Sequence, residues 1–446
     1  IARIQEAIAA GDIRQVNFTF HLRADFAGDP WALFADLVAA QRSSHCAYVD
    51  LGRFVICSAS PELFFRLEGT VIESRPMKGT APRGLTAADD RRQIAWLRQS
   101  EKNRTENMLA ADLVRDDFSR IARPGDIQVP EKFTVERYPT LLQMPSTDRA
   151  ETDASLADIL AATFPPASIA GAPRQNAMRV INELEPGPRG VYTGAIGRIW
   201  PGRRALFNVA IRTAVIDRER NRTDYGVGSG IGQESNATAE YEECLLKARV
   251  LDVRQQSTAD FRLLESLRWA PEEGYALLDE HLDRLRASAE YFVFPFVDDA
   301  IRLALAEASA SESTVTEPSK IRLLLDRRGR ATVEVQPLSA GAKPLPLRVG
   351  LAREPVSSTD VYLYHKTTRR GVYENARSSR PDCDDVILWN ERGELTEASN
   401  ANIVLELDGR LVKVVDFSHN KQGRGSAQGR MTLRDLRSGS LTTHTE

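Results

Sequence analysis

The feature that most constrains the fold is a short polar stretch, RQQSTAD at residues 254–260, inside a chain of 446 residues. A helical pattern that begins near residue 237 ends before this stretch, and a new strand-like run, FRLLESLRW, begins after it. A chain of this length exceeds what one core usually organises, and polar segments of this kind commonly join modules. We therefore expect two modules, at residues 1–253 and 261–415, with a linker at 254–260.

Short β-rich runs surround helical segments in both modules. In the first module, VNFTFHL, HCAYVDLGRFVICSA and LFFRLEG read as strands around the helical PWALFADLVAAQ, and a long helical region follows from about residue 87 to 122. In the second module, helices expected at 277–292 and 297–309 precede strands such as KIRLLLDR. Alternation of period two next to helical periodicity indicates the α+β fold class for both modules.

The C-terminal stretch differs from both modules. Residues 416–446 are rich in Gly, Ser, Thr and Arg, poor in aromatic residues and without sustained periodicity. Such a composition cannot bury enough apolar surface to offset the entropy of ordering. The sequence therefore predicts a disordered tail.

Composition argues against several classes of function. The 59 basic and 62 acidic side chains leave a formal net charge of −3, so nothing favours a nucleic acid or an anionic membrane as partner. No apolar run approaches the roughly eighteen residues that a membrane span needs. Four widely spaced cysteines include no CxxC pair, which indicates neither a zinc site nor a disulfide framework. We expect a cytoplasmic protein that acts on small molecules.

One lysine stands among turn residues in ESRPMKGTAPRG, residues 73–84. Pro76, Gly79, Pro82 and Gly84 around Lys78 are typical of a loop, and loop lysines usually point into solvent. The local sequence alone therefore predicts an exposed side chain for Lys78.

Four glutamates of the first module are candidate acids or metal ligands. Glu240 and Glu243 are three residues apart on a predicted helix and share one face, as glutamates on a solvated helix often do. Together with Glu106 from another helix, they would form an oxygen cage suited to Mg²⁺. Glu62, in SASPELFF, is the fourth candidate.

The glycine-rich segment DYGVGSGIGQES suggests a binding loop. Its G-x-G-x-G-x-G spacing differs from the dinucleotide fingerprint, and it lacks the lysine of a phosphate loop. We expect the backbone amides at Gly228 and Gly230 to bind a small carboxylate together with those of Gly171 and Ala172 in AGAP.

Eight ordered motifs make residues 1–253 resemble the chorismate-utilising enzymes. They are SPELFF, ESRPMKGTAPRG, NRTENMLAADLVRDD, SIAGAPRQNAMRVINELEP, RGVYTGAIG, NVAIRT, GVGSGIGQES and AEYEECLLKA. The family includes anthranilate, isochorismate, salicylate and aminodeoxychorismate synthases, and the resemblance implies a two-layer α/β sandwich. Lysine in P-M-K-G-T, where the anthranilate branch usually has alanine, is the mark of the aminodeoxychorismate synthases.

The resemblance implies a role for each candidate of the first module. Lys78 matches the nucleophile that adds to C2 of chorismate and expels the 4-hydroxyl, after which ammonia enters at C4. Glu62 matches the general acid and base, and Arg212 matches a contact to a substrate carboxylate. The magnesium ligands of the family match Glu106 and Glu243, with Glu240 close by. The implied product is 4-amino-4-deoxychorismate, a precursor of 4-aminobenzoate and folate.

The first module also departs from its relatives. LQMPS at 142–146 lacks the histidine of the usual H-L-V-S, AGAPR at 170–174 replaces T-G-A-P-K, and the portion that relatives carry before IQEAIAAGDIRQVNF is not present. No cysteine lies in the context of a glutaminase nucleophile. Ammonia is therefore expected to come free or from a separate glutamine amidotransferase subunit.

Four motifs make residues 261–415 resemble the class IV pyridoxal-phosphate enzymes, and among them most closely aminodeoxychorismate lyase. They are LLESLRW, LLDEHLDRLRASAEYF, HKTTRRGVY and GELTEASNANIVLELDGRLV. The resemblance implies that Lys366 forms the Schiff base with pyridoxal 5′-phosphate and that Glu397 pairs with the pyridine nitrogen. The resemblance further implies that Arg284 binds the cofactor phosphate and that groups near Ser399 and Asn400 orient the cofactor ring. Ser266 stands where the lyases commonly have a threonine, and it would supply a hydroxyl group in its place.

The end of this second module departs from the resemblance. After LDGRLV the lyases continue with T-P-P and a phosphate-binding loop, for which this sequence has no match. We therefore expect an incomplete class IV fold that binds the cofactor weakly or not at all.

Three interpretations of the whole chain remain open at this point. The first is an aminodeoxychorismate synthase fused to a lyase-like module. The second is an anthranilate- or salicylate-type synthase with an unrelated appendage, which Lys78 and the lyase-like motifs argue against. The third is a truncated pseudoenzyme without turnover, which the altered motifs and the unusual tail favour.

Overall fold

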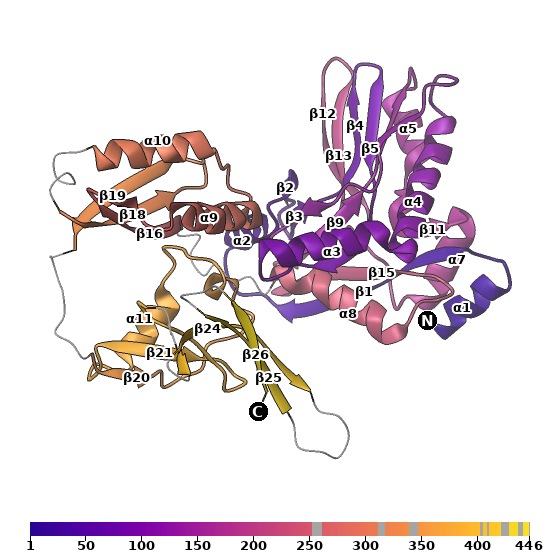
Figure 1. The fold of residues 1–446 in the computed structure, drawn as a ribbon. Helices are drawn as coiled ribbons and strands as arrows, with labels where there is room; N and C mark the ends of the chain where they lie inside the picture. The colour runs from indigo at the N-terminus through magenta and orange to yellow at the C-terminus, as the bar shows by residue number, and fades with distance from the viewer. Residues whose placement is uncertain are drawn as a thin grey trace. The chain divides into compact units, whose positions relative to one another are not determined.

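The computed structural model describes residues 1–251, 261–310, 317–338 and 347–401, and then residues 405–407, 410–420, 428–435 and 440–445. The chain forms two compact units (Figure 1). The first unit contains Ile1–Asp260 with Glu290–Val293, and the second contains Phe261–Ala289 with Phe294–Glu446. The linker predicted at 254–260 lies outside the described residues.

Three antiparallel sheets form the framework of the first unit. One has the strand order β11 (Gly171–Ala172), β1 (Gln15–Asp25), β15 (Arg222–Ile231), β14 (Thr213–Asp217), β3 (Phe54–Ser60) and β2 (His45–Asp50). Another has the order β12 (Ala195–Trp200), β13 (Arg204–Val209), β4 (Leu63–Glu68), β5 (Val71–Arg75), β10 (Thr147–Glu151) and β7 (Gln128–Glu131). The smallest has the order β6 (Met77–Pro82), β9 (Leu141–Pro145) and β8 (Glu136–Arg137).

Eight α-helices complete the described part of this unit. They are α1 (Ala2–Ala9), α2 (Pro30–Gln41), α3 (Ala87–Gln99), α4 (Glu101–Ser119), α5 (Leu156–Thr163), α6 (Ala167–Ala170), α7 (Arg174–Leu184) and α8 (Ala237–Ala248). Helix α4 begins after Ser100, whose hydroxyl caps the amide of Asn103, and α8 begins after Asn236, whose side chain accepts from the amides of Thr238 and Ala239. These caps satisfy amides that lack an intrahelical acceptor, and they fix where the two helices start.

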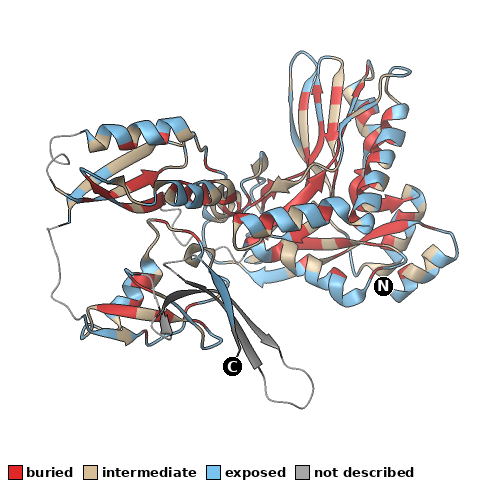
Figure 2. Cartoon of the chain, in the orientation of Figure 1, coloured by how far each residue is buried: buried red, intermediate tan, exposed pale blue. Residues whose placement is uncertain are grey.

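Buried residues lie along the strands and on one face of many helices (Figure 2). One apolar cluster joins α2 and α8 to the sheet of β3, β14 and β15. A second joins α4 and α5 to β4, β5, β10 and β13. The mixture of helices packed on antiparallel sheets confirms the predicted α+β class.

The carboxyl group of Asp148 is buried in this framework. Asp148 of β10 is 0% exposed, and neither of its carboxylate oxygens has a hydrogen-bond partner among the described residues. Burial raises the pKa of Asp148 from 3.8 to about 7. Because the folded-state pKa lies above the unfolded value, this residue lowers stability progressively as the pH rises from about 4 to 7.

We predict that Asp148→Asn stabilises the first unit at pH 8 and has little effect at pH 4. The neutral amide removes the cost of ionising a buried group, so the free energy of unfolding at pH 8 should rise by about 2–4 kcal/mol. Urea denaturation of the full chain at the two pH values measures this difference. The exposed Asp25→Asn serves as the matched control, and an equal gain in both variants would contradict the assignment.

The second unit has a four-stranded and a three-stranded sheet over its described core. The four strands follow the antiparallel order β17 (Gly274–Tyr275), β16 (Leu263–Ala270), β18 (Ser319–Leu325) and β19 (Ala331–Pro337). The three follow the order β20 (Val349–Leu351), β21 (Asp385–Trp389) and β22 (Leu395–Ala398). Its helices are α9 (Leu278–Phe292), α10 (Asp298–Ser309) and α11 (Gly371–Ser378).

The C-terminal stretch differs from the sequence-based expectation of a disordered tail. Strands β23 (Leu405–Leu407), β24 (Arg410–Asn420), β25 (Gln428–Asp435) and β26 (Leu441–Thr445) form an antiparallel sheet in that order. Backbone pairing between successive strands, such as Ser418 with Arg430, orders this stretch although its sequence lacks apolar periodicity.

None of the helices among the described residues is long and apolar enough to cross a membrane.

Candidate active sites of the two units

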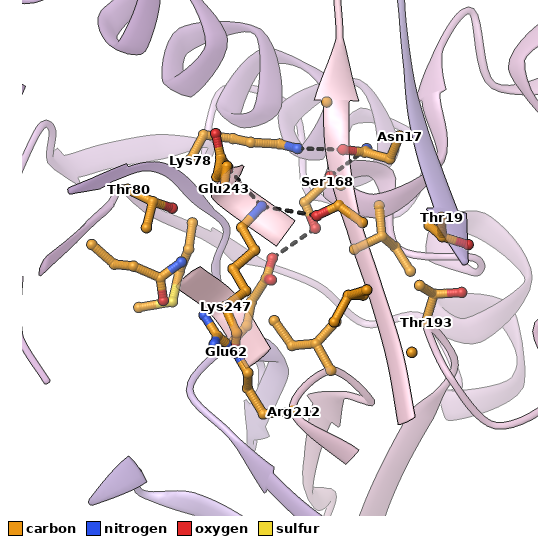
Figure 3. Close-up of a pocket in the computed structure, with 18 of the residues that line it drawn as sticks. Asn17, Thr19, Glu62, Lys78, Thr80, Ser168, Thr193, Arg212, Glu243 and Lys247 are labelled. Atoms are coloured by element: carbon orange, nitrogen blue, oxygen red, sulfur yellow. Dashed lines mark hydrogen bonds and ion pairs between the residues drawn. The ribbon is translucent and has the colours of Figure 1, made fainter. Parts of the chain in front are cut away.

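A cavity in the first unit collects most of the predicted site residues. Seven of the ten residues predicted for this unit line it. They come from the segment before β4, from β6, α4, β15 and α8, and from the residue before β14, and they are Glu62, Lys78, Glu106, Arg212, Gly228, Gly230 and Glu243. Figure 3 shows Lys78, Glu62, Arg212 and Glu243 around this cavity together with Lys247.

Lys78 lies in a strand and not in the loop that its neighbours predict. It belongs to β6, which pairs with β9, and its side chain is partly buried against the cavity. Its Nζ donates a hydrogen bond to Asn17 Oδ1 at 2.6 Å. Burial lowers the pKa of the Lys78 ammonium, while the charges of Glu106, Glu62 and Glu243 oppose this shift. A lowered pKa increases the fraction of neutral, nucleophilic amine.

Two glycines let the backbone come close to Lys78. Gly79 has a φ of 96°, which a residue with a Cβ rarely adopts. At Gly230 of β15, a Cβ would lie 2.5 Å from Gln15 Nε2 and 3.5 Å from Lys78 Nζ. A side chain at Gly230 would therefore displace the Gln15 amide, whereas its distance to Lys78 is an ordinary van der Waals contact.

Glu62 is a buried acid in the turn between β3 and β4. It is 3% exposed, and Ser168 Oγ donates to its Oε1 at 2.6 Å. Burial raises the pKa of Glu62, although the Ser168 hydrogen bond and the Lys78 charge oppose the rise. A raised pKa increases the fraction of the carboxyl group that carries a proton and can donate it to a leaving group.

Arg212 supplies a buried positive charge to the same cavity. It is 4% exposed, its φ of 51° lies in the left-handed region, and its Nη1 donates to the Lys247 carbonyl oxygen. Burial lowers the pKa of the guanidinium, which stays charged because an arginine is protonated in proteins. A guanidinium held in this way can bind a substrate carboxylate.

The three predicted metal ligands are each close to a lysine. Lys247 Nζ lies 2.6 Å from Glu243 Oε1, and Lys102 Nζ lies 2.9 Å from Glu240 Oε1 and 3.9 Å from Glu106 Oε1. Burial raises the pKa of Glu106, against the opposing charges of Lys78 and Lys102. Burial also acts to raise the pKa of Glu243, but the Lys247 ammonium outweighs it and the pKa falls below its usual value.

The donor set of this cavity fits Mg²⁺. Among the described residues, no three His, Cys, Asp or Glu side chains come close enough to enclose a metal ion. Mg²⁺, however, is usually bound by one or two protein carboxylates, with water and substrate oxygens as its other ligands. Glu106 and Glu243 are two such carboxylates on the cavity wall. They are the residues that would hold the ion.

We predict that Glu243→Gln weakens Mg²⁺ binding by at least about 10-fold, since an amide replaces a charged ligand. Calorimetric titration of the protein with MgCl₂ measures the affinity without any turnover. The adjacent Glu242 is exposed and does not line the cavity, so Glu242→Gln is the matched control. Equal affinities for the two variants would rule out Glu243 as a ligand.

Three predicted residues are not among those that line the cavity. Gly171 and Ala172 form the short strand β11 and pair with Val16 and Gln15 of β1. Glu240 is 4% exposed, and its carboxylate accepts hydrogen bonds from Ser229, Ser235 and Lys102. The backbone of Gly171 and Ala172 is thus used within the sheet, and the carboxylate of Glu240 is engaged by protein side chains.

The cavity residues that were not predicted from the sequence include Asn17, Gln143, Ser168 and Lys247. Gln143 is 5% exposed, and its Oε1 has no hydrogen-bond partner among the described residues. Gln143 lies in the LQMPS segment, where relatives usually have the histidine of H-L-V-S. This difference was a signal that the segment belongs to the site. Lys247 is four residues after Glu243 on one helix face, which was a usable signal. Asn17 and Ser168 carry no local signal.

A second cavity lies within the second unit and collects all of its predicted residues. Ser266, Arg284, Lys366, Glu397, Ser399 and Asn400 line it. Lys320, Arg322, Arg369 and Arg370 also line it, so basic side chains greatly outnumber acidic ones. Such a cavity favours an anionic ligand.

The predicted cofactor residues of this cavity have defined partners. Arg284 donates to the buried Glu265 through Nε at 2.7 Å and Nη2 at 2.5 Å. Glu397 accepts a hydrogen bond from the Tyr373 hydroxyl at 2.7 Å. Burial, followed by the Arg284 charge, lowers the pKa of the Lys366 ammonium, and Glu265 opposes this shift. An amine, a carboxylate and several guanidinium groups around one cavity fit the aldehyde, ring nitrogen and phosphate of pyridoxal 5′-phosphate.

Comparison with known families divides the chain in a similar way. A family model described as chorismate binding enzyme matches residues 1–252, more than half of the chain. A model described as amino-transferase class IV matches residues 262–414. A third, described as the elongation factor P (EF-P) KOW-like domain, matches residues 400–445, the stretch that includes β24, β25 and β26.

Individual relatives resemble the first unit. Aminodeoxychorismate synthase component 1 of Salmonella typhimurium is 39% identical over 243 residues, 54% of this chain and 53% of that protein. Anthranilate synthase component 1 of Streptomyces coelicolor is 37% identical over 256 residues, 56% of this chain and 49% of that protein. The chain thus spans about half the length of these curated relatives.

A solved structure resembles the same part of the chain. Anthranilate synthase component I from Streptococcus pneumoniae has a TM-score of 0.52 and 29% sequence identity, over 57% of this chain and 56% of that one. The similarity supports the fold of the first unit. It does not separate the aminodeoxychorismate reaction from the anthranilate reaction.

Proposed function

Because this chain belongs to the family of chorismate binding enzymes, we propose that its first unit converts chorismate and ammonia to 4-amino-4-deoxychorismate. The observation that carries the proposal is Lys78, a partly buried amine on the cavity wall beside the buried acid Glu62. An amine in that position can act as a nucleophile, whereas the alanine typical of the anthranilate branch cannot.

The proposed chemistry uses the protonation states that burial favours. The neutral Lys78 amine adds to C2 of chorismate, the ring double bonds shift, and the 4-hydroxyl leaves as water with a proton from Glu62. Ammonia then adds at C4 and displaces the lysine. The balance is one chorismate and one ammonia for one 4-amino-4-deoxychorismate and one water.

Other residues of the cavity would hold the substrate. Arg212 is a buried guanidinium suited to one carboxylate of chorismate, and backbone groups at Gly228 and Gly230 line the same space. Mg²⁺, held by Glu106 and Glu243, would supply positive charge for a substrate carboxylate. We assign Gly171, Ala172 and Glu240 supporting roles, since they do not line this cavity.

The source of ammonia follows from the same proposal. The matched relative from Salmonella typhimurium is named component 1, which supports a separate component that supplies ammonia from glutamine. Free ammonium ions would serve in its absence. This reaction would take place in the cytoplasm, in the synthesis of 4-aminobenzoate and folate.

For the second unit we propose a binding site for pyridoxal 5′-phosphate. The supporting observation is that Lys366, Glu397, Arg284, Ser399 and Asn400 line one basic cavity. The bound cofactor acts as an electron sink for reactions next to its aldehyde carbon. Lys366 would bind the aldehyde and move protons, Glu397 would hold the ring nitrogen protonated, and the arginines would bind the phosphate. With such a site, release of pyruvate to give 4-aminobenzoate becomes possible.

Product analysis tests these proposals. The full chain is incubated with chorismate, Mg²⁺ and ammonium chloride, and the products are separated and identified by mass spectrometry. 4-Amino-4-deoxychorismate supports an active first unit, and 4-aminobenzoate supports activity in both units. Anthranilate or salicylate would favour the second interpretation, and the absence of turnover would favour a pseudoenzyme.

A further inference from the structure

Three hydrogen bonds connect the two proposed catalytic groups of the first unit. Lys78 Nζ donates to Asn17 Oδ1 at 2.6 Å, and Asn17 Nδ2 donates to the Ser168 carbonyl oxygen at 2.8 Å. Ser168 then donates from its hydroxyl to Glu62 Oε1 at 2.6 Å. Figure 3 shows Lys78, Asn17, Ser168 and Glu62 as sticks, with dashed lines for the hydrogen bonds between them.

The orientation of the Asn17 amide follows from its partners. A backbone carbonyl can only accept a hydrogen bond, so the NH₂ group of Asn17 must face Ser168. Its oxygen must then face Lys78, which can donate. Asn17 is 8% exposed and its backbone is paired with Gly230 in the sheet of β1 and β15. The acceptor for Lys78 therefore has a fixed position.

A neutral acceptor suits a lysine that has to act as a neutral nucleophile. An amide oxygen takes one N–H of the amine and adds no negative charge that would hold a proton on it. With that N–H directed at Asn17, the nitrogen lone pair points away from Asn17. The charged groups whose fields act on Lys78 are Glu106 of α4, Glu62 of the turn before β4, and Glu243 and Lys247 of α8.

We propose that Asn17 is a positioning residue, which directs the Lys78 amine at chorismate through this hydrogen bond. The proposal rests on the proposed function of the first unit, and it assigns Ser168 the role of linking the position of the amine to that of Glu62. Asn17 acts through Lys78: it accepts a hydrogen bond from the attacking nitrogen and forms no bond to chorismate itself.

The test measures the covalent step directly. In the absence of ammonia, attack joins Lys78 Nζ to C2, breaks the C4–O bond and releases water, so the protein gains the mass of chorismate minus water. Intact-protein mass spectrometry follows this gain with time. We expect Asn17→Ala to slow it by about 10- to 100-fold, because small misplacements of a nucleophile have effects of this size. The Kd for chorismate, measured by calorimetry, should change less than about 3-fold.

A matched control separates positioning from folding. Asn208 is a buried asparagine (4% exposed) that donates to the His45 carbonyl oxygen and does not line the cavity. Asn208→Ala should lower the Tm while leaving the rate of mass gain unchanged. If Asn17→Ala fails to fold, Asn17→Asp serves in its place. Its carboxylate should hold the proton on Lys78, so the rate should fall near neutral pH and recover at higher pH.

The outcomes distinguish the two proposals. A wild-type protein that neither gains this mass nor turns over chorismate would overturn the proposed function and the role of Asn17 with it. A wild-type protein that gains the mass, together with an Asn17→Ala variant that gains it equally fast, would overturn the role of Asn17 alone.

Discussion

Lys78→Ala is expected to stop the formation of 4-amino-4-deoxychorismate. The substitution removes the amine from the cavity wall and leaves Glu62 and Arg212 in place. Removing a covalent nucleophile commonly lowers kcat by about 10³-fold or more. Ammonium-dependent product formation, followed by liquid chromatography and mass spectrometry, measures the loss.

A control lysine shows whether the loss is specific. Lys132 is exposed in the first unit and does not line the cavity. Lys132→Ala should therefore keep the wild-type rate. Chorismate binding by Lys78→Ala should persist, because its carboxylate contacts do not depend on the lysine. Unchanged product formation by Lys78→Ala would refute the nucleophile assignment.

Lys366→Ala is expected to abolish the visible absorbance band that forms when pyridoxal 5′-phosphate is added to the wild-type protein. This band requires a covalent bond between the cofactor aldehyde and a lysine amine. Two lysines among the described residues line the second cavity, Lys366 and the exposed Lys320. Burial lowers the pKa of Lys366, which increases the fraction of neutral amine that can attack the aldehyde. We therefore expect the band to be lost although Lys320 remains.

Two comparisons sharpen this test. Lys132→Ala should form the same band as the wild type, because a surface lysine of the other unit is not involved. Borohydride reduction followed by peptide mapping should place the cofactor on Lys366. If the wild-type protein forms no stable band, the proposed cofactor site fails, and the expectation of an incomplete class IV fold is supported.

The fold class and most of the site were predictable because the motifs were recognised together. Glu62, Lys78, Arg212 and Glu243 come from separate segments, and only their common resemblance to one family placed them in one site. The local sequence around Lys78 predicted a loop. The segment becomes a strand because β6 pairs with β9, whose residues lie 59 to 68 positions further along the chain. Local propensity does not indicate such a distant pairing.

The hydrogen-bonded chain behind Lys78 was not predictable. Asn17 and Ser168 are 151 residues apart, and their hydrogen bond follows from the approach of β1 to the segment before β11. Neither residue type is unusual in a sheet or at a helix, so composition and spacing carry no signal. Gly171, in contrast, was expected to contact the substrate because its motif resembles a binding loop. Its backbone pairs with β1 instead.

The different surroundings of Glu240 and Glu243 show a further limit of sequence patterns. The spacing of Glu240 and Glu243 predicts that they share a helix face, and they do so within α8. It does not predict that the carboxylate of Glu240 is engaged by two serines and a lysine, while that of Glu243 faces the cavity. Which carboxylate is available to a metal ion depends on tertiary contacts.

The fate of ammonia nitrogen tests the central proposal most directly. The protein is incubated with chorismate, Mg²⁺ and ¹⁵N-labelled ammonium chloride, and the position of the label is determined by NMR of the purified product. The proposal predicts one ¹⁵N atom on C4, the carbon that carried the hydroxyl of chorismate. A label on C2, as in the anthranilate reaction, or an unlabelled product would contradict it.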